Sequence, residues 1–314
     1  MVAEDQAFLP NFVKTNAIML NFRFYLVFIF SSLVFACESG QSDQEANASE
    51  PEPTYQLTLA SEVQWEDLNP ARGDKSPKAA TLWGDRRGNA EATGFLLKPI
   101  DGFQSPPHIH NVSYRAVVIE GLFHNDDPDA ANLWMSAPSF WTQPAGEVHI
   151  TSAKGENLLA LVEIDHAPYL VQPPEEAFDN GERPINQTPD NIIWLDASEI
   201  SWLNPSDQTQ ATASQIAFLW GKPQQGENFG SFLKLPAGFE GEIMSHAASF
   251  QAVLVQGPAD YRIPTEGADQ RLENGSYFHS LNPARHLIKA TAKQDVILYI
   301  RANGFYQVTP GLSE

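Results

Sequence analysis

Short apolar runs separated by glycine and proline turns follow one another along the chain beyond residue 55. The runs at 115–119, 157–164 and 252–255 are rich in valine, isoleucine, leucine and alanine, and each has the length of a strand. No long stretch has apolar residues at the three- and four-residue spacing of an amphipathic helix. Regularly spaced short strands with turns between them predict an all-β sandwich or barrel.

The apolar pattern belongs to an internal repeat. Residues 102–121 match residues 238–257 at a constant offset of 136. Further matched positions lie on both sides: Leu82-Trp83-Gly84 with Leu219-Trp220-Gly221, His110 with His246, and His149 with His286. We therefore predict two copies of one domain, at 55–170 and 191–314. The proline-rich segment 171–190 between them is predicted to be a linker.

The N-terminal region has the layout of a bacterial lipoprotein signal. Residues 24–36 are almost all apolar, follow Arg23 and end at Cys37. This run is too short to span a bilayer. We predict a signal at 1–37, lipidation of Cys37 and a polar tether at 38–54. The chain would then be exported and lipid-anchored in the bacterial cell envelope, at the outer membrane facing the periplasm.

Two other interpretations of this region stay open, an ordinary cleaved signal and an uncleaved anchor. Glu4 and Asp5 stand where a signal carries positive charge, so Met19 is a better start of translation than Met1. Cys37 is the single cysteine of the sequence, so an intrachain disulfide is excluded.

The chain is strongly acidic, with a formal net charge of −20 and a pI of about 4.7. A protein with a large negative charge repels nucleic acid and anionic membranes. Attachment to a membrane is therefore expected through the N-terminal lipid alone. The partner in solution is expected to be a small molecule.

Three histidines have the spacing of a metal site. His108 and His110 are one residue apart, and His149 follows His110 by thirty-nine residues in a Pro-Ala-Gly-Glu-Val-His turn. Side chains two apart on a strand face the same way, so the first two imidazoles can reach one point, and a paired strand can supply the third. We predict that these side chains hold one divalent metal ion, iron, zinc, manganese or nickel.

These residues resemble the two signature motifs of the cupin superfamily. The first motif is matched by Gly102, His108, His110 and Gly121, and the second by Pro144, Gly146 and His149. The resemblance extends over both repeats, so the chain is similar to bicupins and to a family of cupin-like bacterial proteins. It implies two tandem double-stranded β-helix (jelly-roll) barrels with the metal inside the first. Cupins often pair through their sheets, so the resemblance also implies a homodimer.

The sequence departs from the cupin pattern where that pattern has a metal-binding glutamate. Tyr114 stands at this position, so the resemblance implies a three-histidine site, similar to that of diketone-cleaving and thiol dioxygenases. Tyr114 is expected to point inward, where it would donate a hydrogen bond to a bound anion or plug the site. Gln143, just before the histidine turn, is expected to reach the site as a second-shell or substrate-binding residue.

The second repeat lacks the full set of ligands. Met244 replaces the first histidine and Phe250 replaces the tyrosine, while His246 and His286 remain. His279 is the one nearby candidate for a third ligand. We therefore predict a degenerate site and a structural role for the second barrel.

The polar stretch at 124–129, which begins with His124 and Asn125, has two interpretations. Its aspartates could form part of a cation site. Asparagine, aspartate and proline are turn formers, however, and we predict a solvated turn here.

Three neutral imidazoles leave the charge of a divalent ion uncompensated, so the site is expected to favour anionic, oxygen-donating ligands. With iron, a small chelating anionic substrate would give a dioxygenase-like enzyme, the function that we favour. With zinc, the same ligands support hydrolase or lyase chemistry. A third interpretation is a non-catalytic, lipid-tethered cupin that binds or senses a metal or small ligand, because fold alone does not fix function. The spacing of residues along the sequence identifies no general acid or base beside the three histidines.

Overall fold

The structure is a computed structural model, and it describes residues 52–89, 92–204, 213–291 and 293–311. The predicted signal, Cys37 and nearly all of the predicted tether lie outside the described residues. No helix in these four ranges is long and apolar enough to cross a membrane.

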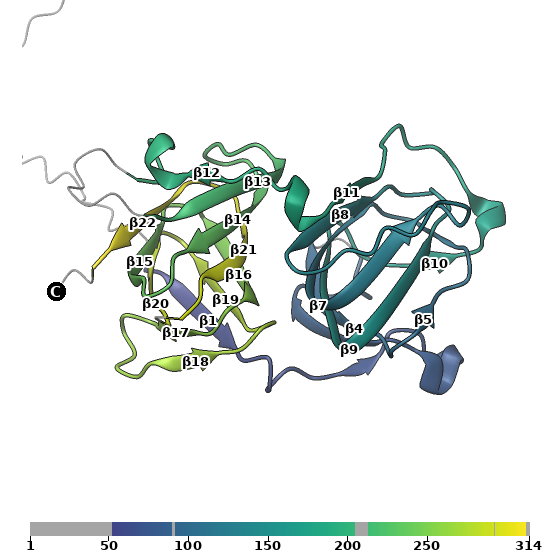
Figure 1. Ribbon diagram of the computed structural model, residues 1–314, viewed down its shortest axis with the longest axis horizontal. Coiled ribbons are helices and arrows are strands. Elements are labelled where there is room, and N and C mark those ends of the chain that lie inside the picture. The colour runs from purple at the N-terminus through teal and green to yellow at the C-terminus, as the bar shows by residue number, and fades with distance from the viewer. Residues whose placement is uncertain (1–51, 90–91, 205–212, 292, 312–314) are drawn as a thin grey trace, which may run out of the picture. The chain divides into compact units, whose positions relative to one another are not determined.

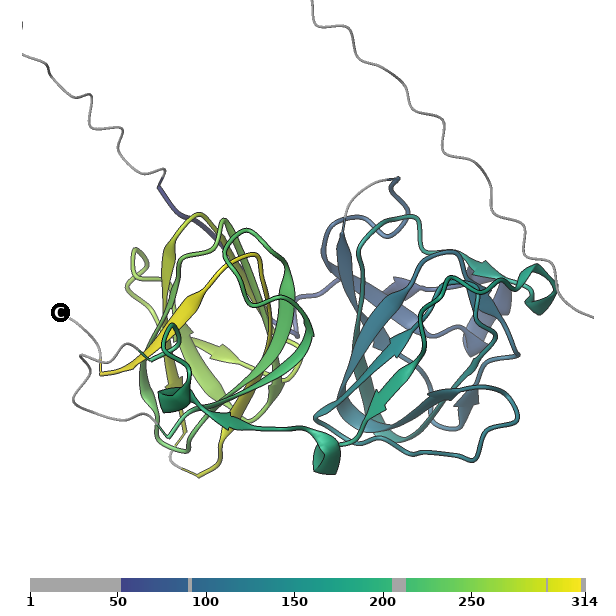
Figure 2. The same cartoon turned by 90° about the horizontal axis from the view of Figure 1, so that it is seen from above.

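The described residues confirm the prediction of an all-β fold. They form twenty-two strands and four short 3-10 helices (Figure 1). The helices are η1 (Pro70–Lys75), η2 (Pro174–Glu176), η3 (Pro189–Asn191) and η4 (Ala197–Glu199). Turned to the view from above, Figure 2 shows the strands of each repeat wrapped into a separate barrel, as the double-stranded β-helix fold requires.

The first barrel has a large sheet in the order β11-β8-β7-β9-β4-β3-β2, with β5 on β9, and a small pair β10-β6. Its strands are β2 (Glu66–Asp67), β3 (Lys78–Trp83), β4 (Thr93–Lys98), β5 (Phe103–Gln104), β6 (Ile109–His110), β7 (Tyr114–Asp126), β8 (Ser139–Gln143), β9 (Ile150–Ile164), β10 (Val171–Gln172) and β11 (Ile185–Gln187). The long strands β7 and β9 pair antiparallel along most of their length and form the frame of the barrel.

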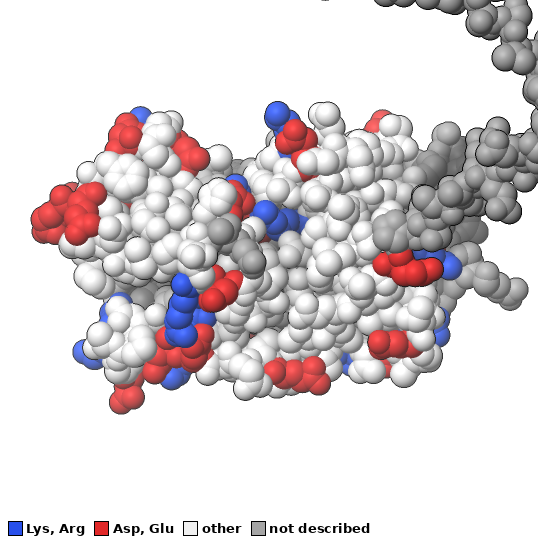
Figure 3. All heavy atoms as spheres, turned by 180° about the vertical axis from the view of Figure 1, so that it is seen from behind, with Lys and Arg blue, Asp and Glu red and all other residues white. Residues whose placement is uncertain are grey.

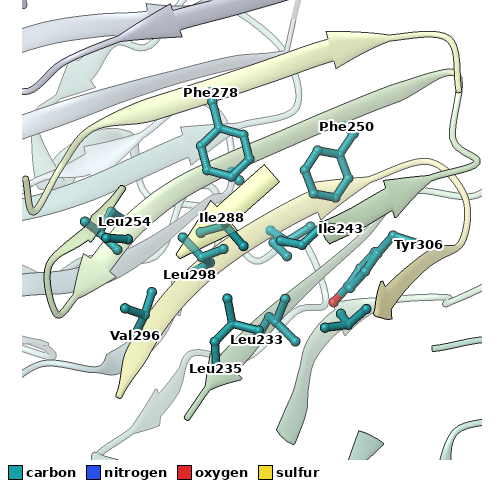
Figure 4. Close-up of a cluster of buried hydrophobic side chains, with 14 of the residues drawn as sticks. Leu233, Leu235, Ile243, Phe250, Leu254, Phe278, Ile288, Val296, Leu298 and Tyr306 are labelled. Atoms are coloured by element: carbon teal, nitrogen blue, oxygen red, sulfur yellow. The ribbon is translucent and has the colours of Figure 1, made fainter. Parts of the chain in front are cut away.

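The second barrel has sheets in the orders β1-β19-β16-β21-β14-β13-β12 and β18-β17-β20-β15-β22. Its strands are β1 (Thr54–Thr58), β12 (Leu195–Asp196), β13 (Gln215–Gly221), β14 (Phe229–Leu235), β15 (Glu240–Ser245), β16 (Ser249–Gln256), β17 (Ala259–Arg262), β18 (Gln270–Leu272), β19 (Tyr277–Leu281), β20 (Ala284–Ala290), β21 (Val296–Ala302) and β22 (Tyr306–Pro310). Its interior is filled by apolar side chains such as Ile243, Phe250 and Tyr306 (Figure 4).

The predicted domain bounds need two corrections. Strand β1, assigned from the sequence to the first domain, pairs antiparallel with β19 of the second. The predicted linker is not a simple connection, since β10 pairs with β6 and β11 pairs with β8 of the first barrel. The second barrel thus receives β1 from the segment before the first barrel, and the first barrel receives β10 and β11 from the segment before the second. The exchange covers sheet edges whose N–H and C=O groups would otherwise be unpaired.

The two repeats contact each other through equivalent residues. One buried apolar cluster contains Val117 and Leu161 of the first barrel and Val253 and Ile297 of the second. Each of these pairs is separated by the repeat offset of 136. The contact therefore resembles the isologous interface of a two-fold dimer, built within one chain.

Most charged side chains lie on the outside of both barrels, but Glu163 and Arg301 form a buried ion pair at 3.3 Å. On the face in Figure 3, acidic groups are spread over the surface with basic groups beside several of them. The ion pairs of Lys78 with Asp67, at 2.6 Å, and of Arg271 with Asp260, at 2.8 Å, join partly exposed side chains. Such pairs contribute little to stability, so the fold depends on its buried apolar clusters.

Candidate metal centre

Neighbouring segments of the first barrel bring His108, His110 and His149 together. His108 and His149 form an antiparallel bridge, with N–O distances of 3.1 and 3.0 Å in the two directions. His110 lies in β6, two residues further along. The Nε2 atoms of His108 and His110 are 3.2 Å apart, and candidate ligand atoms of all three histidines lie within 4.8 Å of one another.

A glycine fixes the turn that carries His149. Gly146 has a φ of +77°, and a Cβ at this position would lie 2.4 Å from the carbonyl oxygen of Phe178. Its N–H donates to the carbonyl of His110 at 2.9 Å. A larger residue would therefore strain the turn and disturb the hydrogen bond that ties it to β6.

The other ring nitrogen of each histidine faces a backbone carbonyl. Nδ1 of His108 lies 2.9 Å from the Pro106 oxygen, and Nδ1 of His110 lies 2.9 Å from the Leu170 oxygen. Nδ1 of His149 lies 3.1 Å from the Glu147 oxygen. A carbonyl can only accept, so each Nδ1 carries the proton and each Nε2 keeps its lone pair. This is the tautomer of a metal-binding histidine whose ring is oriented by a second-shell carbonyl.

Burial keeps these imidazoles neutral. All three side chains are buried. Burial, reinforced by the neighbouring histidines, holds the pKa of His110 well below its usual range and lowers the pKa of His149 to about 3. Burial is also the main cause of the lowered pKa of His108. Since a metal binds the unprotonated ring, the site needs no deprotonation near neutral pH.

Tyr114 and Gln143 belong to one buried hydrogen-bond network behind the histidines. Tyr114 donates to Oδ1 of Asn125 at 2.8 Å, and Nδ2 of Asn125 donates to Oε1 of Gln143 at 2.8 Å. Gln143 in turn donates to the Glu147 carbonyl at 3.3 Å, the oxygen that also receives Nδ1–H of His149. Tyr114 thus points inward, with its hydroxyl 3.5 Å from Nε2 of His149, and Gln143 acts on the histidine turn from behind.

The prediction of a solvated turn at 124–129 is wrong for His124 and Asn125, and a turn follows only at 127–130. Both residues belong to the end of β7, and both are buried. Asn125 is the centre of the network, since its Oδ1 also accepts from Thr151 at 2.7 Å. The strand continues because β9 pairs with it as far as Asp126. Tertiary pairing has overridden the local preference of these residues for a turn.

Tyr169 is a site residue that sequence reasoning missed. Its ring stacks on His110 with centroids 4.2 Å apart, and its hydroxyl lies 3.0 Å from Nε2 of the same histidine. Burial raises the pKa of Tyr169 well above its usual value, so the hydroxyl stays protonated. The repeat carries a signal for this residue, because Tyr169 aligns with Tyr306 at the offset that relates His149 to His286.

A cavity of about 130 Å³ opens beside the histidines. Its walls are mostly apolar and include Leu97, Phe103 and Val162. His108, His110, Tyr114 and Tyr169 contribute polar atoms, and Arg72 lines the cavity as well. An apolar pocket with a few convergent polar groups is the usual form of a small-molecule site.

The second barrel does not repeat this arrangement. His246 is exposed, and the half-buried His279 lies on the strand face opposite to its buried neighbours Phe278 and Ser280. His286 is buried, with Nδ1 2.8 Å from the Tyr261 hydroxyl and Nε2 3.1 Å from the Ser280 hydroxyl. Both ring nitrogens of His286 are therefore occupied by protein groups.

The donor set of the first barrel fits a divalent metal ion. Across the described ranges, His108, His110 and His149 form the one group of three potential ligands that meets the distance requirement. Three neutral imidazole nitrogens suit zinc, iron, nickel or manganese, and the ion would take the place of the Tyr169 hydroxyl at Nε2 of His110.

A family model described as a domain of unknown function, DUF4437, matches residues 56–309. The chain belongs to the DUF4437 family. No curated protein matches this DUF4437 chain.

Solved structures resemble the DUF4437 chain at low sequence identity. A Nostoc punctiforme protein with a provisional dioxygenase assignment has a TM-score of 0.57 and 14% identity, covering 83% of this chain and 87% of the other. A salicylate 1,2-dioxygenase from Pseudaminobacter salicylatoxidans has a TM-score of 0.49 and 12% identity, covering 82% and 87%. The first likeness supports the fold, a pair of double-stranded β-helix barrels, and at this identity it shows the fold alone.

Proposed function

We propose that His108, His110 and His149 bind one divalent metal ion through Nε2, and that the chain is a dioxygenase-like enzyme of a small, chelating, anionic substrate. The observation that carries the proposal is the set of three Nδ1–carbonyl contacts, at 2.9, 2.9 and 3.1 Å. They orient three lone pairs toward one region beside a cavity. Carbonyl partners of this kind commonly accompany metal-binding histidines.

A bound ferrous ion would supply binding positions for a chelating anion and the capacity to react with dioxygen. The chain's own residues would position the substrate and exclude water. Burial raises the pKa of Tyr114 to about 12, so its hydroxyl stays protonated and keeps its hydrogen bond to Asn125 behind the histidines. The hydroxyl of Tyr169 lies on another side of the site, 3.0 Å from Nε2 of His110. With a metal ion on Nε2 of His110, the Tyr169 hydroxyl would be available to donate to a bound oxygen atom and stabilise its negative charge.

The polar groups of the cavity favour this chemistry over zinc-dependent hydrolysis. Besides the histidines they are hydroxyls, an amide and one guanidinium, from Tyr114, Tyr169, Asn69 and Arg72 among others. Hydrolytic sites commonly place a carboxylate or a further histidine beside the water that it activates. The tyrosine hydroxyls, with their raised pKa values, are donors and poor bases.

We also propose that Cys37 is lipidated and tethers the mature chain in the bacterial cell envelope. The support is the apolar run at 24–36 followed by the cysteine. Mass spectrometry of the mature N-terminus tests it, and a mature chain that begins before Cys37 would contradict it. Pairing of two chains is a further proposal, which the molar mass in solution tests.

Oxygen uptake tests the enzymatic part. Iron-loaded protein is screened with β-diketones, thiols and hydroxy acids, beside a His110→Ala variant. We expect oxygen consumption with one of these classes, and none from the variant. If iron is bound tightly and no compound causes oxygen consumption, the chain is a binding or sensing protein and the enzymatic proposal fails.

A further inference from the structure

Arg72 lies at the side of the cavity formed by the segment from Leu68 to Pro77. It belongs to η1, whose start is capped by Asn69, with Oδ1 accepting from the N–H of Ala71 at 3.1 Å. The hydroxyl of Ser76 accepts from the N–H of Asn69 at 3.0 Å and closes the segment on itself. These bonds fix the backbone that carries Arg72.

Arg72 differs from the other arginines of the described ranges. Eight others each form an ion pair with an aspartate or glutamate: Arg86, Arg87, Arg115, Arg183, Arg262, Arg271, Arg285 and Arg301. Among the described residues, Arg72 has no such partner. The chain has 39 acidic and 19 basic residues, so carboxylates are plentiful. An unpaired guanidinium at a cavity wall is available to a ligand.

The surroundings of Arg72 hold it beside the histidines. Its guanidinium carbon lies 5.2 Å from the centroid of the Phe103 ring. Its charge is close enough to His108 to lower the pKa of that imidazole, though less strongly than burial does. A guanidinium stacked on an aromatic face keeps its N–H edge free for an acceptor in its own plane. A carboxylate matches that edge with two parallel hydrogen bonds.

We propose that Arg72 binds the carboxylate of a small carboxylic acid held in this cavity, whose metal-binding atoms would face the histidines. The inference deepens the proposed function, and it rests on that function for the metal at the histidine end. The walls that would contact the apolar part include Leu97, Phe103 and Val171. The volume of about 130 Å³ is close to that of cavities that hold one benzene molecule, about 150 Å³. The ligand is therefore about the size of a single ring.

Calorimetric titration of the zinc-loaded full chain tests this inference without turnover. The probes are benzoate and 2-methylpropanoate, with benzamide as the neutral counterpart of benzoate. The variants are Arg72→Gln, Arg72→Lys and the matched control Arg87→Gln, an exposed arginine that pairs with Glu66 outside the cavity. We expect Arg72→Gln to weaken carboxylate binding by about tenfold or more, because a hydrogen bond to a charged group is lost. Arg72→Lys keeps the positive charge but cannot form the two parallel hydrogen bonds of a guanidinium. Its carboxylate affinity should therefore lie between that of the wild type and that of Arg72→Gln.

The controls separate this inference from the proposed function. Arg87→Gln should bind carboxylates like the wild type, and Arg72→Gln should keep the zinc content and the unfolding midpoint of the wild type. Benzamide binding should change little in Arg72→Gln. If the wild type binds no zinc and carboxylate binding still depends on Arg72, the metal proposal fails and the carboxylate site stands.

Three outcomes would overturn the inference. One is unchanged carboxylate affinity in a folded, zinc-loaded Arg72→Gln variant. Another is a wild type that binds neither carboxylate at millimolar concentration. The third is binding of inorganic phosphate through Arg72 in place of both carboxylates. In each case zinc content still reports on the three histidines independently.

Discussion

The first and second barrels place a histidine at equivalent points, His149 before β9 and His286 in β20, and surround it differently. Nδ1 of His149 contacts the Glu147 carbonyl at 3.1 Å, which leaves Nε2 with its lone pair. In His286 both nitrogens contact hydroxyls, of Tyr261 and Ser280. The same scaffold thus holds one imidazole as a candidate ligand and the other as a structural core residue. The neighbouring rings separate the two roles, because His108 and His110 lie beside His149 whereas Phe250 and Phe278 lie beside His286.

The residues around the two histidines also differ between the barrels. Phe250, the equivalent of Tyr114, stacks on His286 with centroids 4.9 Å apart. Tyr306, the equivalent of Tyr169, forms a hydrogen bond of 2.9 Å with Ser231. Apolar side chains fill the interior around them (Figure 4). The first barrel keeps a cavity where the second is packed, and the second barrel is a natural control for experiments on the first.

His286→Ala should have the largest effect on stability. It removes two buried hydrogen bonds and leaves a cavity in the packed interior, at a cost of about 3 kcal/mol. Urea unfolding measures the loss. The metal content should stay that of the wild type, because His286 lies in the other barrel. A variant that loses metal would contradict the separation of roles.

Acid should weaken the second barrel through the same residue. Burial lowers the pKa of His286 to about 3 in the folded chain, against 6.5 for the unperturbed group. The unfolded chain therefore binds the extra proton first as the pH falls, and stability decreases between these two values by up to about 1.4 kcal/mol per pH unit. His286→Gln removes this contribution. The stability gap between the variant and the wild type should narrow from pH 7 to pH 5, and parallel profiles would refute the assignment.

Exchanging the equivalent aromatic residues should have smaller and unequal costs in the two barrels. Tyr114→Phe loses one hydrogen bond to Asn125, whose Oδ1 still accepts from Thr151 at 2.7 Å, so the cost is about 1 kcal/mol. Its metal content should not change. Phe250→Tyr buries a new hydroxyl among Phe278, His286 and Tyr306 and should cost more. Thermal unfolding compares them, and an equal or reversed order would count against this account of the two interiors.

Met244→His should have no effect on metal content. It restores the missing histidine of the second repeat, but His246 is exposed and both nitrogens of His286 are engaged. We expect the number of bound ions per chain to equal that of the wild type. A second ion would show that spacing alone suffices to build the site.

Much of the fold could be predicted from the sequence because its patterns are local. Short apolar runs and the 136-residue repeat indicate two all-β barrels, and the structure confirms this fold class. The spacing of His108 and His110 predicts that their imidazoles point the same way, because alternate residues of a strand share a face. The structure brings these two histidines and His149 together.

Other features depend on tertiary contacts that leave no periodic signal. Strands β1 and β11 each pair with a barrel that their place in the sequence does not indicate. Asparagine favours turns, but Asn125 lies in a strand because β9 pairs with it. Arg72 reaches the cavity from a short 3-10 helix, and its importance lies in the lack of an acidic partner among the described residues. Such a relation is visible only in three dimensions.

The most direct test of the central claim is metal analysis of the chain purified without added metal. Elemental mass spectrometry measures the metal content of the wild type, His149→Ala and His286→Ala side by side. We predict about one divalent ion per chain in the wild type and in His286→Ala, and almost none in His149→Ala, since three ligands are needed to hold the ion. An unchanged metal content in His149→Ala, or a wild type without metal, would contradict the account.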